Sequence, residues 1–225
     1  MKATLQRALW RTLPVLAAVA AACGSVGAAV LYQQSPVDDG LALLANYSVS
    51  GGFGTQNADS FSLGSATRIE RIQWWGTAPS GNGSFVVRLF PELLGGGDIF
   101  DVLTGGVTDA ATGLTDDSGA SIRLFELTLD TPIDLPAGTR HLSVFFDSVD
   151  TWAWLEGSGG DDVSAFRGMD LDRWQFLPPD LSFALLGERI PQGAPEPGVL
   201  ALVAVASLAG LGIRRRRSNP APLGG

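Results

Sequence analysis

The sequence predicts an all-β protein whose central part folds as an antiparallel β-sandwich of jelly-roll type. Apolar and polar residues alternate with a period of two in at least seven short segments, as they do in strands with one buried face. Clusters of Gly, Pro, Ser and Asn separate these segments and supply turns. No central segment carries an 11-residue helical repeat. This combination favours an antiparallel sandwich, with a closed barrel as the less favoured alternative.

The expected strands lie within residues 41–187, and each is defined by side chains that would share the buried face. In chain order these are Phe61 and Leu63; Ile72 and Trp74; Phe85, Val87 and Leu89; Phe125, Leu127 and Leu129; Leu142, Val144 and Phe146; Trp152 and Trp154; and Leu181, Phe183 and Leu185. We expect long and unequal loops at residues 95–120 and 156–175. Loops of this kind fit a sandwich better than a barrel.

The first 29 residues have the organisation of a secretory signal peptide. Its basic residues are Lys2, Arg7 and Arg11. An apolar segment at residues 13–22 follows them and has the length of a signal peptide rather than of a spanning helix. Small residues place the expected cleavage after Ala28 or Ala29, with residues 30–40 as a linker to the domain. The alternative is a lipoprotein signal that ends at Cys23 and leads to its acylation.

A second apolar segment with marked ends lies near the C-terminus. Residues 198–213 are uncharged and, as a helix with about 1.5 Å per residue, would span roughly 24 Å of the ~30 Å hydrocarbon core. Bilayer thinning and snorkelling arginines close such a gap. We expect a single transmembrane helix there, with residues 188–194 as a linker and residues 218–225 as a cytoplasmic tail. The flanking residues are Pro195, Glu196 and Pro197 before the helix and Arg214, Arg215, Arg216 and Arg217 after it.

A Pro-Glu-Pro triplet, a short hydrophobic helix and an arginine cluster, in this order, resemble the PEP-CTERM sorting signal of Gram-negative and related bacteria. The resemblance covers residues 195–217. It implies export, processing near the triplet by an exosortase, and delivery to the cell surface or the exopolysaccharide. Cytoplasmic arginines would leave the sandwich outside the membrane. Residues 58–76 also resemble the opening of a sandwich domain that recurs in exported PEP-CTERM proteins and carries no catalytic motif.

The part between the two hydrophobic ends is strongly acidic. It contains eight arginines and no lysine, against all 23 acidic residues of the chain. This charge argues against a nucleic-acid partner, because phosphates demand a basic footprint, and it fits a hydrated matrix or divalent cations. Cys23 is the only cysteine, and cleavage of the signal peptide would remove it. The mature domain would then contain no disulfide and would depend on its core for stability.

Two acidic segments suggest a Ca²⁺ site, because clustered carboxylates are the oxygen ligands that this ion prefers. The first segment contains Asp109, Asp116 and Asp117, and the second, which we take as the candidate Ca²⁺ site, contains Asp161, Asp162, Asp170 and Asp172. Neither reproduces the spacing of an EF-hand loop. The alternative is a solvated acidic loop.

Tryptophan residues suggest a carbohydrate-binding surface, since exposed aromatic faces stack against sugar rings. The candidates are Trp74, Trp75, Trp152 and Trp154. Neighbouring Trp74 and Trp75 must point to opposite faces of a strand, whereas Trp152 and Trp154 share a face. The alternative, which we favour, is that these residues form the core.

Enzyme chemistry finds little support in the sequence. His141 is the only histidine, and its position at the start of a strand favours a structural role. No Gly-x-Ser-x-Gly elbow and no phosphate-binding loop occurs. We therefore expect a non-enzymatic exported protein of the cell surface or exopolysaccharide matrix, with an exosortase and the membrane as transient partners. The alternatives are a carbohydrate-binding module and, more weakly, a polysaccharide hydrolase.

Overall fold

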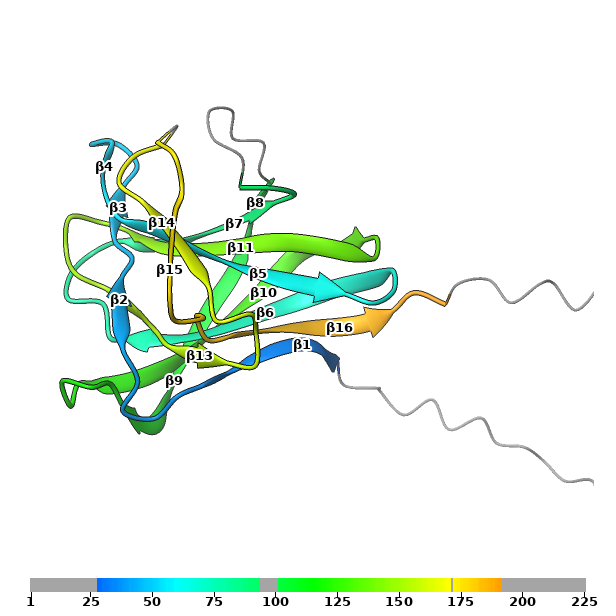
Figure 1. Ribbon diagram of the computed structural model, residues 1–225, viewed down its shortest axis with the longest axis horizontal. Helices are drawn as coiled ribbons and strands as arrows, with labels where there is room; N and C mark the ends of the chain where they lie inside the picture. Colours follow the sequence, from blue (N-terminus) through cyan, green and yellow to red (C-terminus); the bar gives the residue numbers. More distant parts are fainter. Residues whose placement is uncertain (1–27, 94–100, 171, 192–225) are drawn as a thin grey trace, which may run out of the picture.

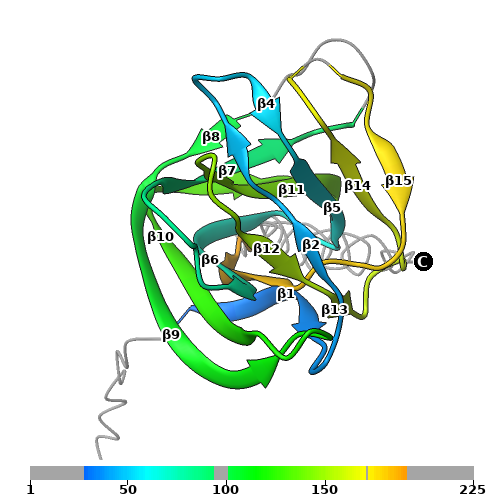
Figure 2. The same ribbon diagram turned by 90° about the vertical axis from the view of Figure 1, so that its left-hand side faces the viewer.

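The structure, a computed structural model, describes residues 28–93, 101–170 and 172–191, and this part of the chain is built from antiparallel strands without a helix. Two sheets pack face to face as a sandwich (Figures 1 and 2). This arrangement confirms the predicted all-β class with antiparallel sheets. The signal-peptide residues 1–27 and the sorting-signal residues 195–217, with the expected helix at 198–213, lie outside the described residues. No helix able to cross a bilayer occurs in the described ranges.

The two sheets have different sizes. The larger one has the order β13 (Gly157–Ser158), β1 (Ala29–Pro36), β16 (Phe183–Arg189), β6 (Thr67–Thr77), β10 (Ser121–Leu135) and β9 (Gly105–Thr115), with β12 (Ala153–Leu155) pairing with β6 and with β2 (Ala42–Leu44). The smaller one has the order β15 (Gln175–Leu177), β14 (Ser164–Arg167), β5 (Gln56–Leu63), β11 (Gly138–Asp147), β7 (Ser84–Phe90) and β8 (Asp101–Leu103). A short hairpin joins β3 (Tyr47–Ser48) to β4 (Phe53–Gly54).

The core between the sheets is rich in aromatic rings. Every side chain that the alternation assigned to the buried face belongs to one apolar cluster, and of these side chains only Phe85 is half-buried. The Trp74 ring stacks on Phe125 at 5.9 Å, and the Phe85 ring meets Trp152 edge-on at 5.0 Å. Such pairs contribute about 0.5–1.5 kcal/mol each beyond the apolar area that they bury. An aromatic core therefore stabilises a domain without disulfides.

The segment 30–40, expected to be a linker, instead contains most of β1. This strand pairs with β16 and places Gln33 opposite Ala184 in the larger sheet. Its side chains directed into the sandwich include Tyr32 and Gln34, which hydrogen-bond to each other. Polar groups at inward positions hide the alternation, which explains why the sequence pattern missed this strand.

The two loops expected at 95–120 and 156–175 also contain strands. β8 and β9 occupy most of the first segment, whereas β13, β14 and the start of β15 form short strands within the second. β9 is an edge strand and most of its residues are exposed, so it lacks a buried apolar face. An edge strand of this kind carries no hydrophobic alternation, and only its partner β10 reveals it.

The first and last strands of the domain meet at one end of the sandwich. Ala29 at the start of β1 pairs with Gly187 near the end of β16. Figure 1 shows the start of the blue strand and the end of the orange strand close together at the right-hand side. Both chain ends of the domain therefore leave it from the same place.

Candidate functional site

The tryptophans expected to contact sugars lie mainly inside the protein. The side chains of Trp74, Trp152 and Trp154 are 0% exposed and pack between the sheets. Trp75 points to the opposite face of β6 and is half-buried. Three of the four tryptophans therefore belong to the core, as the favoured alternative expected, and these three offer no ring face to a polysaccharide.

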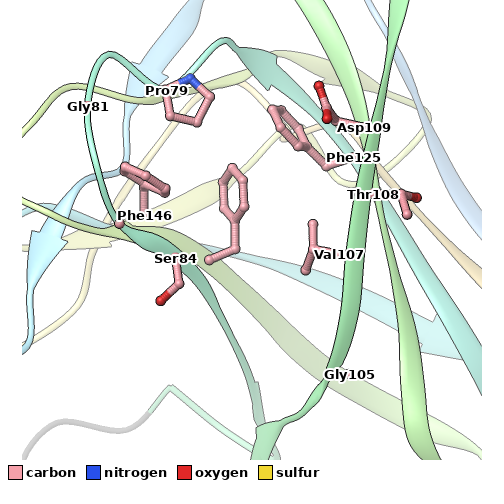
Figure 3. A pocket seen from close by; sticks show the side chains of 11 residues that line it. Pro79, Gly81, Ser84, Gly105, Val107, Thr108, Asp109, Phe125 and Phe146 are labelled. Atoms are coloured by element: carbon pink, nitrogen blue, oxygen red, sulfur yellow. The ribbon is translucent and has the colours of Figure 1, made fainter.

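A cleft of about 610 Å³ opens instead between β7 and β9, at one side of the sandwich (Figure 3). Its apolar lining consists of Phe85, Phe125, Phe146, Val107 and Pro79. The Phe85 ring lies 4.6 Å from Phe125 and 5.2 Å from Phe146, measured between ring centroids. The cleft therefore exposes the edge of the aromatic core to solvent.

Polar groups line the same cleft. Ser84 contributes from β7, and Thr108 and Asp109 contribute from β9. Asp109 forms an ion pair with Arg123 of the neighbouring strand β10, and its side chain remains 44% exposed. An aromatic lining with a few polar groups is the usual composition of a small-molecule site.

Gly83 lines one wall of the cleft at a position with no space for a side chain. A Cβ atom on Gly83 would lie 2.6 Å from the carbonyl oxygen of Asp147 and 2.8 Å from the Phe146 ring. Only a residue without a side chain fits this position unless the wall moves.

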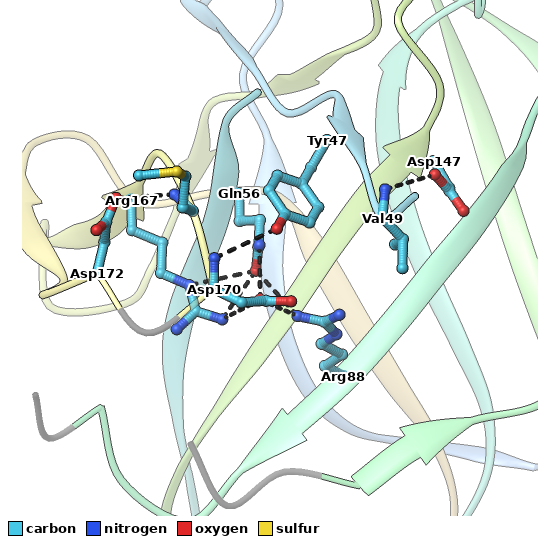
Figure 4. Close-up of polar contacts among 9 residues, drawn as sticks. Tyr47, Val49, Gln56, Arg88, Asp147, Arg167, Asp170 and Asp172 are labelled. Carbon is cyan, nitrogen blue, oxygen red and sulfur yellow. Dashed lines mark hydrogen bonds and ion pairs between the residues drawn. The ribbon is translucent and has the colours of Figure 1, made fainter. Parts of the chain in front are cut away.

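No three of the acidic residues predicted to bind Ca²⁺, all of which the structure describes, have their carboxylates grouped together. Asp170 accepts hydrogen bonds from Arg88 at 2.7 Å and from Arg167 at 2.9 Å, and Gln56 bonds to the same oxygen (Figure 4). Asp172 accepts the backbone N–H of Met169, and Asp162 is exposed in a left-handed conformation. Asp161 lies next to Asp162 in the loop between β13 and β14, where its carboxylate approaches those of Asp59 and Asp180.

Arg88 and Arg167, the two arginines that bind Asp170, also pack against aromatic rings on the outer face of the smaller sheet. The Arg167 guanidinium lies 4.4 Å from the centroid of the Trp174 ring, and the Arg88 guanidinium lies 4.8 Å from that of Phe145. Burial alone would raise the pKa of Asp170, but hydrogen bonds from Arg88 and Gln56 outweigh this effect and keep the pKa below its usual value. These contacts indicate a structural role for Asp170.

Three carboxylates come together at a different place. One oxygen each from Asp59, Asp161 and Asp180 forms a group in which all atoms lie within 4.8 Å of one another. Burial raises the pKa of Asp59 to about 8, although backbone N–H groups of Leu181 and Ser60 favour its charged form. Sequence reasoning found only Asp161, because Asp59 lies within a strand and no local pattern links it to Asp180.

His141 does not form a catalytic arrangement with the described residues. Its Nδ1 atom is buried and has no hydrogen-bond partner. Burial lowers the pKa of the His141 side chain. No described serine or threonine hydroxyl hydrogen-bonds to it. The side chain lines a shallow hollow together with Phe176 and Leu93.

The described residues thus form a β-sandwich with an aromatic cleft on one side and an acidic cluster beside β1. Comparison of the chain with protein-family models, curated proteins and solved structures found no match.

Proposed function

We propose that this chain is an exported, non-enzymatic protein of the cell surface or extracellular matrix, sorted by an exosortase. The proposal rests on the signal-like residues 1–29 and on the Pro-Glu-Pro, apolar and arginine segments of residues 195–217. An exosortase would act near Glu196 after the helix had anchored the chain in the membrane. The sandwich would then be released to the surface or to the exopolysaccharide.

One structural observation supports this proposal most directly: the domain ends where the two expected processing sites begin. β1 starts at Ala29, next to the expected signal cleavage, and β16 ends at Arg189, shortly before Pro195. Ala29 pairs with Gly187, so both cuts fall at the same end of the sandwich. Two cleavages there would free the domain and remove at most Ala29, the first residue of β1.

The geometry of the acidic cluster supports a non-enzymatic role. A glycosidase places two carboxyl groups on either side of the bond that it cleaves. Asp59 is 0% exposed and Asp180 is 4% exposed, so in this cluster only Asp161 reaches solvent. A polysaccharide cannot contact two of these carboxylates at once.

Mass spectrometry of both termini of the mature protein, isolated from the envelope and the medium, tests the sorting proposal. We expect an N-terminus near Val30 and a C-terminus near Pro195–Pro197. Glu196→Ala should leave the C-terminal segment uncut, whereas Glu188→Ala, which changes an exposed acid of the domain itself, should be processed normally. A mature chain that still ends at Gly225 would show that the helix is an ordinary anchor.

A second candidate function, carbohydrate binding, is favoured by the cleft between β7 and β9. Its aromatic lining and its polar groups Thr108 and Asp109 suit the apolar faces and the hydroxyls of a sugar. Val107→Trp would fill the cleft from β9, while Val149→Trp places the same side chain at an exposed position outside it. If the cleft binds exopolysaccharide, only Val107→Trp should abolish co-sedimentation with the purified polymer. Equal binding by both variants would exclude the cleft.

We also propose that the sandwich is a jelly-roll variant. Strands β1, β16, β6 and β10 lie side by side in one sheet, and β5, β11 and β7 lie side by side in the other. Strands that are consecutive along the chain, such as β5 and β6, thus lie in opposite sheets, as in a jelly roll. An experimental structure would test this assignment through its strand order.

A further inference from the structure

The cleft between β7 and β9 has one charged side chain among the residues that line it. That residue is Asp109, and the other lining residues are of the types Gly, Pro, Ser, Thr, Val and Phe. Asp109 lies opposite Phe125 in the pairing of β9 with β10, so both side chains are on the same face of the larger sheet. Figure 3 shows the carboxylate beside the Phe125 ring. The charge of the cleft therefore depends on Asp109 and on the group that binds it.

Arg123 is the cation that binds Asp109. It precedes Phe125 by two positions on β10 and therefore points to the same face of the sheet. Its Nε and Nη2 atoms both contact the Oδ2 atom of Asp109. The side chains of Arg123 and Asp109 are 35% and 44% exposed, so solvent reaches this ion pair. No described donor contacts the Oδ1 atom of Asp109, which leaves this oxygen available to a hydroxyl group.

Uncharged sugars match these groups better than acidic sugars do. A sugar hydroxyl can donate a charge-assisted hydrogen bond to Asp109, while the apolar face of the ring contacts Phe85 and Val107. The carboxylate of an acidic sugar would instead meet the Asp109 carboxylate, since the Arg123 guanidinium is already engaged. The part of the chain between its hydrophobic ends also has 23 acidic residues against eight arginines, which repels a polyanion at longer range. Both effects exclude acidic polymers.

The cleft lies at the end of the sandwich opposite to the two chain ends. Thr67, where β6 begins, pairs with Arg189, the last residue of β16. β6 has 11 residues, which span about 36 Å at about 3.3 Å per residue, and Pro79 of the cleft follows its other end (Figure 1). A polymer could therefore reach the cleft while the expected helix at 198–213 still anchored the chain.

We propose that this cleft binds uncharged polysaccharide chains and that Asp109 sets this specificity by neutralising Arg123. The inference rests on the carbohydrate binding proposed above and adds the class of polymer to it. Without the Asp109 carboxylate, the Arg123 guanidinium would be an unpaired cation beside the aromatic lining. It would then bind the carboxylates of an acidic polymer. Asp109 is thus a specificity-determining residue of the cleft.

Co-sedimentation of the full chain in mild detergent with exopolysaccharide, separated by anion exchange into a neutral and an acidic fraction, tests this inference. EDTA keeps divalent cations from bridging the acidic protein to the acidic polymer. We expect the unaltered protein to bind the neutral fraction at least about tenfold more tightly than the acidic one. Asp109→Asn should remove most of this difference by strengthening the binding of the acidic fraction, and added salt should weaken that gain. Because asparagine keeps an acceptor oxygen, this variant should still bind the neutral fraction.

Asp117→Asn is the matched control. It removes one negative charge from an exposed acid outside the cleft, so it should keep the preference for the neutral fraction. Equal binding of both fractions by the unaltered protein would overturn the charge specificity and leave carbohydrate binding in place. An equal gain in Asp117→Asn would overturn the role of Asp109, because overall charge would then reject the acidic polymer. Binding of neither fraction would overturn carbohydrate binding itself, and this inference with it.

Discussion

Asp170 and Arg88 form a 2.7 Å ion pair across 82 positions of the chain, and the pair joins β7 to the segment that follows β14. The same carboxylate oxygen binds the fully buried Arg167. Asp170→Asn removes the charge that both guanidinium groups face, so we expect the free energy of unfolding to fall by about 2–3 kcal/mol. Urea denaturation measures this loss. Asp172→Asn is the control, because Asp172 contacts a backbone N–H rather than the arginines, and it should cost clearly less.

The same carboxylate predicts an acid dependence. Because the pKa of Asp170 is lowered in the folded protein, the unfolded chain takes up this proton first, at about pH 3.9. The stability that Asp170 contributes is therefore complete well above that pH and is lost as the pH falls through the folded-state pKa. We expect the difference between the unaltered protein and Asp170→Asn to be largest near about pH 6 and to shrink below about pH 4. Urea midpoints measured across this range check it, and a constant difference would contradict it.

Two neighbouring tryptophans should respond differently to the same substitution. The Nε1 atom of Trp154 donates to the carbonyl oxygen of Ser182 at 2.8 Å, whereas that of Trp152 is buried without an acceptor. Both side chains are 0% exposed, so changing either to Phe removes a similar volume. Trp154→Phe also removes a satisfied hydrogen bond, while Trp152→Phe removes an unsatisfied donor. We expect Trp154→Phe to cost about 1 kcal/mol more in the free energy of unfolding. Equal losses in denaturant titration would argue against this difference in hydrogen bonding.

The core was predictable from the sequence because the alternation that defines it is visible within each strand. Phe125, Leu127 and Leu129 alternate along one strand, and a period of two places them on one face whatever the partner strand is. β1 was not predictable in this way, because Gln34 faces inward, and β9 was not, because its residues face solvent as an edge strand.

The acidic cluster shows more clearly what could not be predicted from the sequence. The Asp59 carboxylate accepts a hydrogen bond from the backbone N–H of Leu181, which lies 122 positions further along the chain. No spacing within either segment indicates that Asp59 and Asp180 meet, since only the pairing of the sheets brings them together. Sequence proximity grouped Asp161 with Asp170 instead, although Asp170 faces two arginines. Carboxylates that are neighbours in sequence are thus a poor guide to those that share a site.

Two glycines at the edges of the sandwich give the last prediction, because they differ in the space around them. A methyl group on Gly83 would meet the Asp147 carbonyl oxygen at 2.6 Å and the Phe146 ring at 2.8 Å, whereas one on Gly106 of β9 would meet nothing within 4 Å. Neither backbone is left-handed, so strain of that kind does not enter. Gly83→Ala should lower the free energy of unfolding by about 1–3 kcal/mol through overpacking, and Gly106→Ala should change it by no more than about 0.5 kcal/mol. Denaturant titration of both variants compares them directly. A Gly83→Ala protein as stable as Gly106→Ala would mean that the cleft wall moves to accept a side chain.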